Sequence, residues 1–171
     1  IVQRFVLRIE IATYYRRDFR KILGLSLTVK VDDIASRLGE IIRPLDEDLC
    51  KDYCGVAFVD STTGLKHIYY NQSESFNRQR FTKAHELGHF VLEHTVFKES
   101  SMMTLGELYK VIDDHFEKEA NLFASEILMP SATVLRLAGS KVGRTEYDLA
   151  ILFNISIEAV DWKLRYLHII D

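Results

Sequence analysis

The strongest constraint in the sequence is the stretch His85-Glu86-Leu87-Gly88-His89, in which two histidines four residues apart flank a glutamate. Residues i and i+4 lie on one face of an α-helix, so His85 and His89 can offer two imidazole nitrogens to one metal ion. In this arrangement Glu86 lies beside the open position of the ion, where it can accept a proton from an attacking water. The pattern therefore predicts a metal centre with hydrolytic chemistry.

The residues around this motif favour a buried helix over an exposed amphipathic helix that merely carries polar side chains. Apolar residues recur along one side of it, at Phe81, Ala84, Gly88, Val91 and Leu92. Such a stripe buries a helix against a core, and a buried pair of histidines needs a partner. A catalytic zinc takes three protein ligands and leaves its fourth position for water, so another segment must supply the third ligand.

Residues 113–130 predict one long helix that ends at Pro130 and supplies this ligand. At about 100° per residue, Glu117 lies roughly 60° from the centre of its apolar stripe, and Glu119 roughly 100° away on the opposite flank. Glu117 is therefore the predicted ligand, and Glu119 is the alternative. Asn121 lies one turn after Glu117, where its side chain can hydrogen-bond a ligating histidine and fix its tautomer. The stripe comprises Phe116, Ala120, Phe123, Ala124, Ile127 and Leu128.

The remaining histidines do not extend the motif. His94 does not fit the longer H-E-x-x-H-x-x-G-x-x-H pattern, and it is interpreted as a neighbouring surface histidine or as a partner behind a ligand. His67 and His115 are interpreted as ordinary histidines. The side chain that stabilises an oxyanion stays unassigned, with His115, Tyr109 and Tyr147 as candidates, and no substrate-binding residue is predicted.

Composition limits the class of protein. With 171 residues, 47% of them hydrophobic, the chain matches one globular domain with a small appendage. It contains neither the apolar run of about eighteen residues that a membrane span requires nor a leader peptide, so we expect a cytoplasmic protein without a membrane partner. Cys50 and Cys54 have no second pair to complete a zinc site and are interpreted as ordinary thiols.

The pattern along the chain predicts three segments. Residues 1–30 form a basic amphipathic helical segment, interpreted as a solvated face in preference to a surface for an acidic partner or nucleic acid. Residues 31–130 form the metal-binding core, and residues 131–171 form a C-terminal helical subdomain that resembles a helix-turn-helix. In that subdomain Thr145 with Asp148 predicts a capping box, and Ser156 predicts a second helix start.

Short apolar runs at 41–45, 55–59 and 65–70 predict strands before the metal-binding helix. The turn residues 60–64 join the last two runs into an antiparallel hairpin. The expected fold class is α+β, with a small antiparallel sheet packed on a helical core. Residues 67–70 are a candidate rail for a substrate backbone, or simply an edge of the sheet.

Charge argues against DNA as the main partner. The formal net charge is −3, and residues 144–171 carry three Lys and Arg residues against five Asp and Glu residues. An element that faces phosphates is expected to have the opposite balance. Direct DNA binding is therefore disfavoured, and the C-terminal helices are expected to pack or to recognise a protein.

Two motifs in order strongly resemble the ImmA/IrrE family of zinc metallopeptidases. The first is Arg78-Gln79-Arg80-Phe81-Thr82-x-Ala84-His85-Glu86-Leu87-Gly88-His89-Phe90. The second is Glu117-x-x-Ala120-Asn121-x-Phe123-Ala124-x-x-x-Leu128-Met129-Pro130. Looser similarity at 34–39 and 149–156 extends the resemblance over most of the chain. Lys83 departs from the pattern, where an apolar residue is expected, and the basic segment at the N-terminus is the part that the resemblance explains least.

The resemblance implies a zincin-like metallopeptidase domain in which His85, His89 and Glu117 bind zinc and Glu86 is the general base. It also implies an endopeptidase that cleaves helix-turn-helix repressors and so relieves repression of mobile-element or stress-response genes. Some relatives are encoded beside such repressors as pairs that resemble toxin and antitoxin. The alternative is a non-hydrolytic regulator that holds zinc and sequesters a repressor. Two histidines and one glutamate would also accept manganese or another divalent metal.

Overall fold

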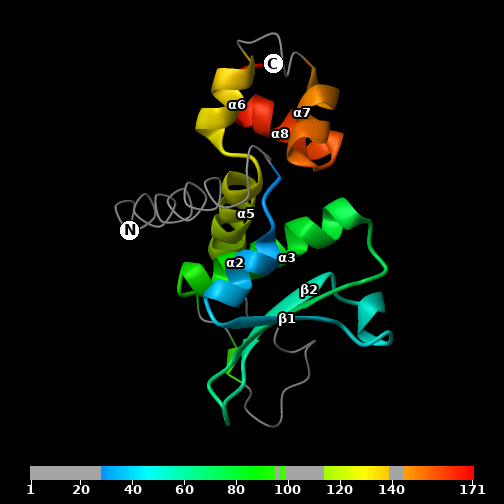
Figure 1. Ribbon diagram of the computed structural model, residues 1–171, viewed down its shortest axis with the longest axis vertical. Coiled ribbons are helices and arrows are strands. Elements are labelled where there is room, and N and C mark those ends of the chain that lie inside the picture. Colours follow the sequence, from blue (N-terminus) through cyan, green and yellow to red (C-terminus); the bar gives the residue numbers. More distant parts are fainter. Residues whose placement is uncertain (1–27, 95–96, 99–113, 139–144) are drawn as a thin grey trace. The chain divides into compact units, whose positions relative to one another are not determined.

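In the computed structural model of the chain, residues 28–94, 97–98, 114–138 and 145–171 are described (Figure 1). The predicted basic segment 1–30 therefore lies almost wholly outside the described residues. Contacts divide the chain into two units, one formed by Lys30–Ala124 and one that contains Ser125–Asp171. The segment boundaries predicted from the sequence, after residues 30 and 130, stay predictions.

The first unit contains a four-stranded sheet beside its helices, which confirms the α+β class. The strands are β1 (Glu40–Pro44), β2 (Gly55–Val59), β3 (Lys66–Tyr70) and β4 (Phe97–Lys98), in the order β1-β3-β2-β4. The predicted hairpin is present as the antiparallel pair β2 and β3. Asp60 forms its turn by accepting hydrogen bonds from the backbone N–H groups of Thr62 and Thr63, at 2.8 and 3.2 Å.

The prediction of an antiparallel sheet is wrong, because the sheet is mixed. Strand β1 pairs with β3 in parallel, and β4 pairs with β2 in parallel. Between β1 and β2 the chain reverses direction through a long connection that contains the 3-10 helix η1 (Leu49–Lys51), and the gap left between these strands is filled by β3. Residues 66–70 thus have a paired strand on both sides, so 67–70 is neither an edge of the sheet nor a free rail for a substrate.

Helix α3 (Phe76–Val91) carries the predicted metal-binding motif and lies on one face of the sheet, as Figure 1 shows. It begins at Ser75, whose hydroxyl accepts a hydrogen bond from the backbone N–H of Arg78. The short helix α2 (Val31–Arg37) is tied to α3 by the ion pair between Lys83 and Asp32, at 2.8 Å. The core of this unit includes the fully buried side chains of Ile68, Ala84 and Leu87.

The predicted helix over 113–130 is observed as α5 (Asp114–Leu128), whose last four residues belong to the second unit. That unit continues with α6 (Ser131–Ala138), α7 (Glu146–Phe153) and α8 (Ile157–Tyr166). The predicted capping box of Thr145 and Asp148 is present, and Ser156 accepts a hydrogen bond from the Ala159 N–H. A buried ion pair joins Lys163 of α8 to Glu126 of α5.

Among the described residues, no helix is both long enough and apolar enough to cross a membrane. The cytoplasmic location stays a prediction.

Glu40 at the start of β1 is a buried carboxyl whose loss of hydration is only partly offset by protein contacts. Its side chain is 2% exposed, and its Oε1 lies 4.0 Å from Lys66 Nζ. No donor among the described residues hydrogen-bonds its Oε2. Burial raises the pKa of Glu40 from 4.5 to about 7, although the positive charge of Lys66 acts in the opposite direction.

This pKa predicts how stability depends on pH. A carboxyl with a higher pKa in the folded state than in the unfolded state holds its proton more tightly when folded, so it destabilises the fold progressively as the pH rises from 4.5 to about 7. We expect Glu40→Gln to raise the free energy of unfolding by on the order of 1–2 kcal/mol at about pH 8, after allowance for screening by solvent, and to have little effect at about pH 5. Urea unfolding of the metal-free protein measures this.

The matched control for this prediction is Glu47→Gln, because Glu47 is an exposed glutamate in the connection that follows β1. An equal change at both pH values in Glu40→Gln would contradict the predicted titration.

Candidate metal centre

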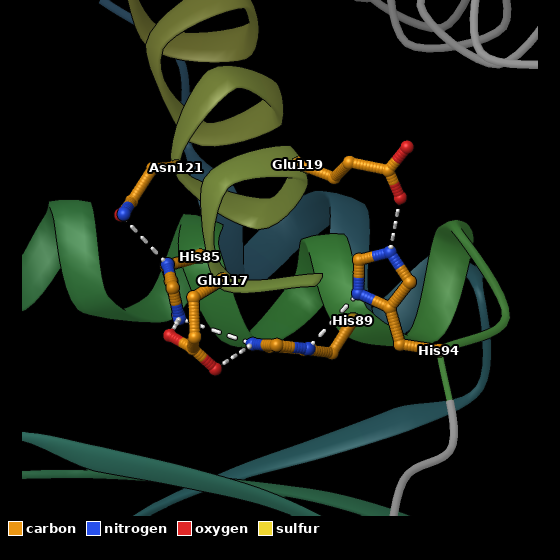
Figure 2. A network of polar contacts seen from close by, with 6 residues as sticks. All are labelled: His85, His89, His94, Glu117, Glu119 and Asn121. Atoms are coloured by element: carbon orange, nitrogen blue, oxygen red, sulfur yellow. Dashed lines mark hydrogen bonds and ion pairs between the residues drawn. The ribbon is translucent and has the colours of Figure 1, made fainter. Parts of the chain in front are cut away.

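Helices α3 and α5 bring together the three residues predicted as ligands. His85 Nε2 and His89 Nε2 lie 3.0 Å apart on α3. Glu117 of α5 places its carboxylate oxygens 3.1 Å from His85 Nε2 and 3.4 Å from His89 Nε2. Figure 2 shows these three side chains converging on one point. Their ligand atoms all lie within 4.8 Å of one another.

These separations fit a single metal ion. Two nitrogens bound to one tetrahedral zinc at about 2.0–2.1 Å lie roughly 3.3 Å apart, close to the observed separations of 3.0–3.4 Å. The donor set of two imidazoles and one carboxylate is also that of known catalytic zinc sites. The Glu117 side chain is 32% exposed, so the cluster is open to water on one side. The three residues could therefore hold a divalent metal ion.

Gly88 permits the close helix crossing that places Glu117 beside the histidines. A Cβ atom at position 88 would lie 2.9 Å from Cδ1 of Phe123 and 3.4 Å from Cα of Ala120. Phe123 and Ala120 are both buried and cannot simply swing away. The glycine in the motif thus lets α5 approach the backbone of α3 one turn from the ligands.

The first histidine is oriented from behind by Asn121. The side-chain oxygen of Asn121 lies 3.0 Å from His85 Nδ1, the contact predicted from the sequence. An amide oxygen only accepts hydrogen bonds, so His85 carries its proton on Nδ1. This leaves the Nε2 lone pair of His85 directed at the ligand cluster, as a metal ligand requires.

The alternative ligand, Glu119, lies outside the ligand cluster. Its Oε2 lies 3.0 Å from His94 Nε2, and His94 Nδ1 in turn lies 3.0 Å from His89 Nδ1 (Figure 2). His94 is buried, so of the two interpretations from the sequence it is the partner behind a ligand and not a surface histidine. The sequence analysis did not anticipate its link to Glu119, because 25 residues separate the two in the chain.

Glu86 lies buried between the ligand cluster and strand β2. Its carboxylate accepts a hydrogen bond from the Ala57 backbone N–H. A Cβ atom at Gly55 would lie 3.1 Å from Glu86 Oε1 and 2.3 Å from Thr82 Cγ2, so only glycine fits at this position. Burial raises the pKa of Glu86, and the nearby His85 and His89 act to lower it. Sequence reasoning missed Gly55, because a glycine at the start of a strand gives no local sign of a close approach.

The carboxylates of the ligand cluster favour a positive charge beside them. The contacts of Glu117 with the imidazoles of His85 and His89 hold the pKa of this carboxyl well below its ordinary value. Burial opposes protonation of His85, but its contact with Glu117 and the charges of Glu86 and Glu117 outweigh burial and raise its pKa. Both shifts show that the carboxylates favour a cation at the imidazole nitrogens. A metal ion would supply that charge and would displace protons on binding.

The candidate histidines His67 and His115 have contacts outside the ligand cluster. His67 stacks on Phe58 in the sheet, with ring centroids 5.0 Å apart. His115 is exposed and contacts Glu119 Oε1 at 3.4 Å. Tyr109 lies outside the described residues, and Tyr147 belongs to the second unit. Cys50 and Cys54 are free thiols, as interpreted from the sequence.

The close crossing at Gly88 makes a testable prediction. Alanine is favoured over glycine in a helix by about 1 kcal/mol, yet we expect Gly88→Ala to lower the free energy of unfolding by about 1–3 kcal/mol through overpacking. We also expect weaker metal binding, because Glu117 moves away with α5. Urea unfolding without metal and competition with a chelator measure the two effects. Unchanged stability and unchanged metal affinity would show that the helices do not depend on this contact.

Comparison with known proteins agrees with this geometry. A family model described as Peptidase_M78, IrrE N-terminal-like domain, matches residues 54–165, a range that contains all the residues of the cluster. The Metallopeptidase ImmA of Bacillus subtilis (strain 168) is 30% identical over 105 residues, which cover 61% of this chain and 59% of that protein. The chain therefore matches about three fifths of its relative's length. The match of the family model over more than half of the chain shows that this protein belongs to the IrrE N-terminal-like family of metallopeptidases, whose chemistry implies a divalent metal.

Proposed function

We propose that this protein is a zinc-dependent endopeptidase that cleaves a helix-turn-helix transcriptional repressor at one site and so relieves repression of mobile-element or stress-response genes. The observation that carries the hydrolytic part is the convergence of His85, His89 and Glu117 beside the buried carboxylate of Glu86. Membership in a metallopeptidase family supports it.

His85, His89 and Glu117 would hold the metal ion. Zinc suits two imidazoles and one carboxylate, and manganese or another divalent metal is the alternative. When bound, the ion supplies Lewis-acid chemistry, which makes a water more acidic and a peptide carbonyl more electrophilic. Asn121 holds His85 in the tautomer that this role needs.

Glu86 would act as the general base. Its carboxylate is buried, and burial raises its pKa, which makes the carboxylate a stronger base. The Ala57 N–H fixes its orientation from the sheet. Glu86 would take the proton of the attacking water and later return it to the leaving amine.

The substrate class rests on the family resemblance and on charge. Residues 144–171 carry Glu146, Asp148, Glu158, Asp161 and Asp171 against Arg144, Lys163 and Arg165, and Arg136 lies earlier in the same unit. Lys163 is fully buried against Glu126, so its charge is neutralised inside the unit. The net acidic balance of residues 144–171 disfavours contacts with DNA phosphates and suits a basic protein partner such as a repressor.

The ligand assignment predicts a ranking of metal affinities. We expect Glu117→Gln to weaken zinc binding by more than about 100-fold. Loss of a residue that only hydrogen-bonds a metal ligand typically weakens metal binding by about 10- to 100-fold. Glu119→Gln is the matched control on the same helix, and its effect should be much smaller. Competition with a chromophoric chelator measures both. A larger loss in Glu119→Gln would exchange the two assignments.

The proposed activity predicts the behaviour of a Glu86→Gln variant. Metal-loaded protein and this variant are each incubated with candidate helix-turn-helix repressors, and the products are read by intact-mass spectrometry. We expect one discrete cut, with the rate lowered by at least about 100-fold in the variant, because general-base catalysis contributes that much. Metal content should stay unchanged.

The outcomes separate the two functional candidates. An intact repressor that co-purifies equally with both proteins would overturn the peptidase and favour the non-hydrolytic regulator. Cleavage that persists in Glu86→Gln would remove Glu86 from the role of base.

A further inference from the structure

We propose that His94 and Glu119 are positioning residues that fix the orientation and tautomer of the ligand His89. The inference rests on the proposed function, because it assumes that His89 binds a metal ion. It goes beyond that function by giving a role to two residues that do not reach the ligand cluster themselves.

The direction of each hydrogen bond follows from Glu119. A carboxylate oxygen accepts a hydrogen bond, so the 3.0 Å contact with Glu119 Oε2 assigns a proton to His94 Nε2. Neutral His94 then has a bare Nδ1, which accepts a proton from His89 Nδ1 across 3.0 Å. His89 is thereby left with its lone pair on Nε2, the atom that lies 3.0 Å from His85 Nε2.

The hydrogen bonds from His89 to His94 and from His94 to Glu119 form a relay, which the surroundings of His94 hold in place. The side chain of His94 is 3% exposed, so water cannot easily replace either hydrogen bond. Its ring stacks on Phe116 of α5, with centroids 4.7 Å apart and an angle of 20° between the planes. The backbone N–H of His94 donates to the His89 carbonyl at 3.0 Å, which keeps the two imidazoles at a constant spacing. Glu119 is also held at its other oxygen by His115, at 3.4 Å.

With the relay, both histidine ligands are oriented by a hydrogen-bond acceptor that comes from α5. Asn121 lies on the same flank of the apolar stripe of α5 as Glu117, whereas Glu119 lies on the opposite flank. Asn121 reaches His85 directly at 3.0 Å, whereas Glu119 reaches His89 through His94. A single helix thus supplies one ligand and the acceptors that orient the other two. Carboxylate–histidine partners of this kind also increase the basicity of a ligand.

The first test measures zinc affinity in a double-mutant cycle. We expect His94→Phe, which keeps the ring against Phe116, and Glu119→Leu each to weaken zinc binding by about 10- to 100-fold. If Glu119 acts through His94, the double variant should be no weaker than His94→Phe alone. Glu119→Gln, which retains an acceptor oxygen, should restore most of the affinity. His67→Phe is the matched control, because His67 stacks on Phe58 and Tyr69 in the sheet, and it should bind zinc like the unmodified protein.

The second test reads the tautomers directly. Proton–nitrogen correlation spectra of histidine-labelled protein, recorded with and without zinc, should show His94 protonated on Nε2 with a bare Nδ1. In Glu119→Leu this preference should be lost, and in Glu119→Gln it should persist. A purely structural role for Glu119 would not change which nitrogen of His94 carries the proton. This measurement does not need a folded His94→Phe variant.

Failure of the relay and failure of the proposed function give different results. A proton on His94 Nδ1 in the unmodified protein, or additive losses of zinc affinity in the double variant, would overturn the relay whether or not a repressor is cut. An uncut repressor, or cleavage that persists in Glu86→Gln, concerns only the peptidase activity. The tautomer of His94 decides the relay even in a protein that cleaves nothing.

Discussion

The close crossing of α3 and α5 at Gly88 is the contact on which the rest of the site depends. Helix α3 alone offers two histidines, and two ligands do not hold a catalytic metal. The third ligand comes from a helix about thirty residues later in the chain, and it reaches the histidines only because the Gly88 backbone can lie against Phe123 and Ala120. A glycine in the middle of a helix costs roughly 1 kcal/mol of helix propensity. In this protein that cost is offset by the packing of α5 and by the completion of the ligand set.

The polar groups behind the ligands create a charge arrangement that a cation completes. Asn121 leaves the lone pair of His85 directed inward, and the proposed relay through His94 does the same for His89. Together with Glu117, two lone pairs and one carboxylate then face each other within 3.4 Å. Without a cation these groups repel or must take up a proton, which is consistent with the raised pKa of His85. Metal binding and local stability are therefore coupled, since the same ion that serves chemistry also removes this repulsion.

The parts of this structure that the sequence predicted are those fixed by local geometry. The spacing of His85 and His89 and the angular position of Glu117 each follow from the helical period, and the capping box at Thr145 follows from residue types at a helix start. The structure places all of them as expected. The parallel pairing of β1 with β3 was not predictable in the same way, because an apolar run does not specify its neighbour. Glu119 shows the same limit: its angle on α5 suggested a second-choice ligand, whereas its partner is set by where α3 ends and His94 follows.

Strand β2 has a role in the site as well as in the fold. The general base proposed here must be buried enough to be basic yet must stay ionised, and these requirements oppose each other. Gly55 lets the strand backbone approach Glu86 closely, and the Ala57 N–H donates to its carboxylate and stabilises the charged form. His85 and His89, on the other side, also act to lower its pKa. The hairpin of β2 and β3 therefore fixes the position of the carboxylate and limits how far burial can raise its pKa, so the sheet and the ligand helices together determine the protonation state of Glu86.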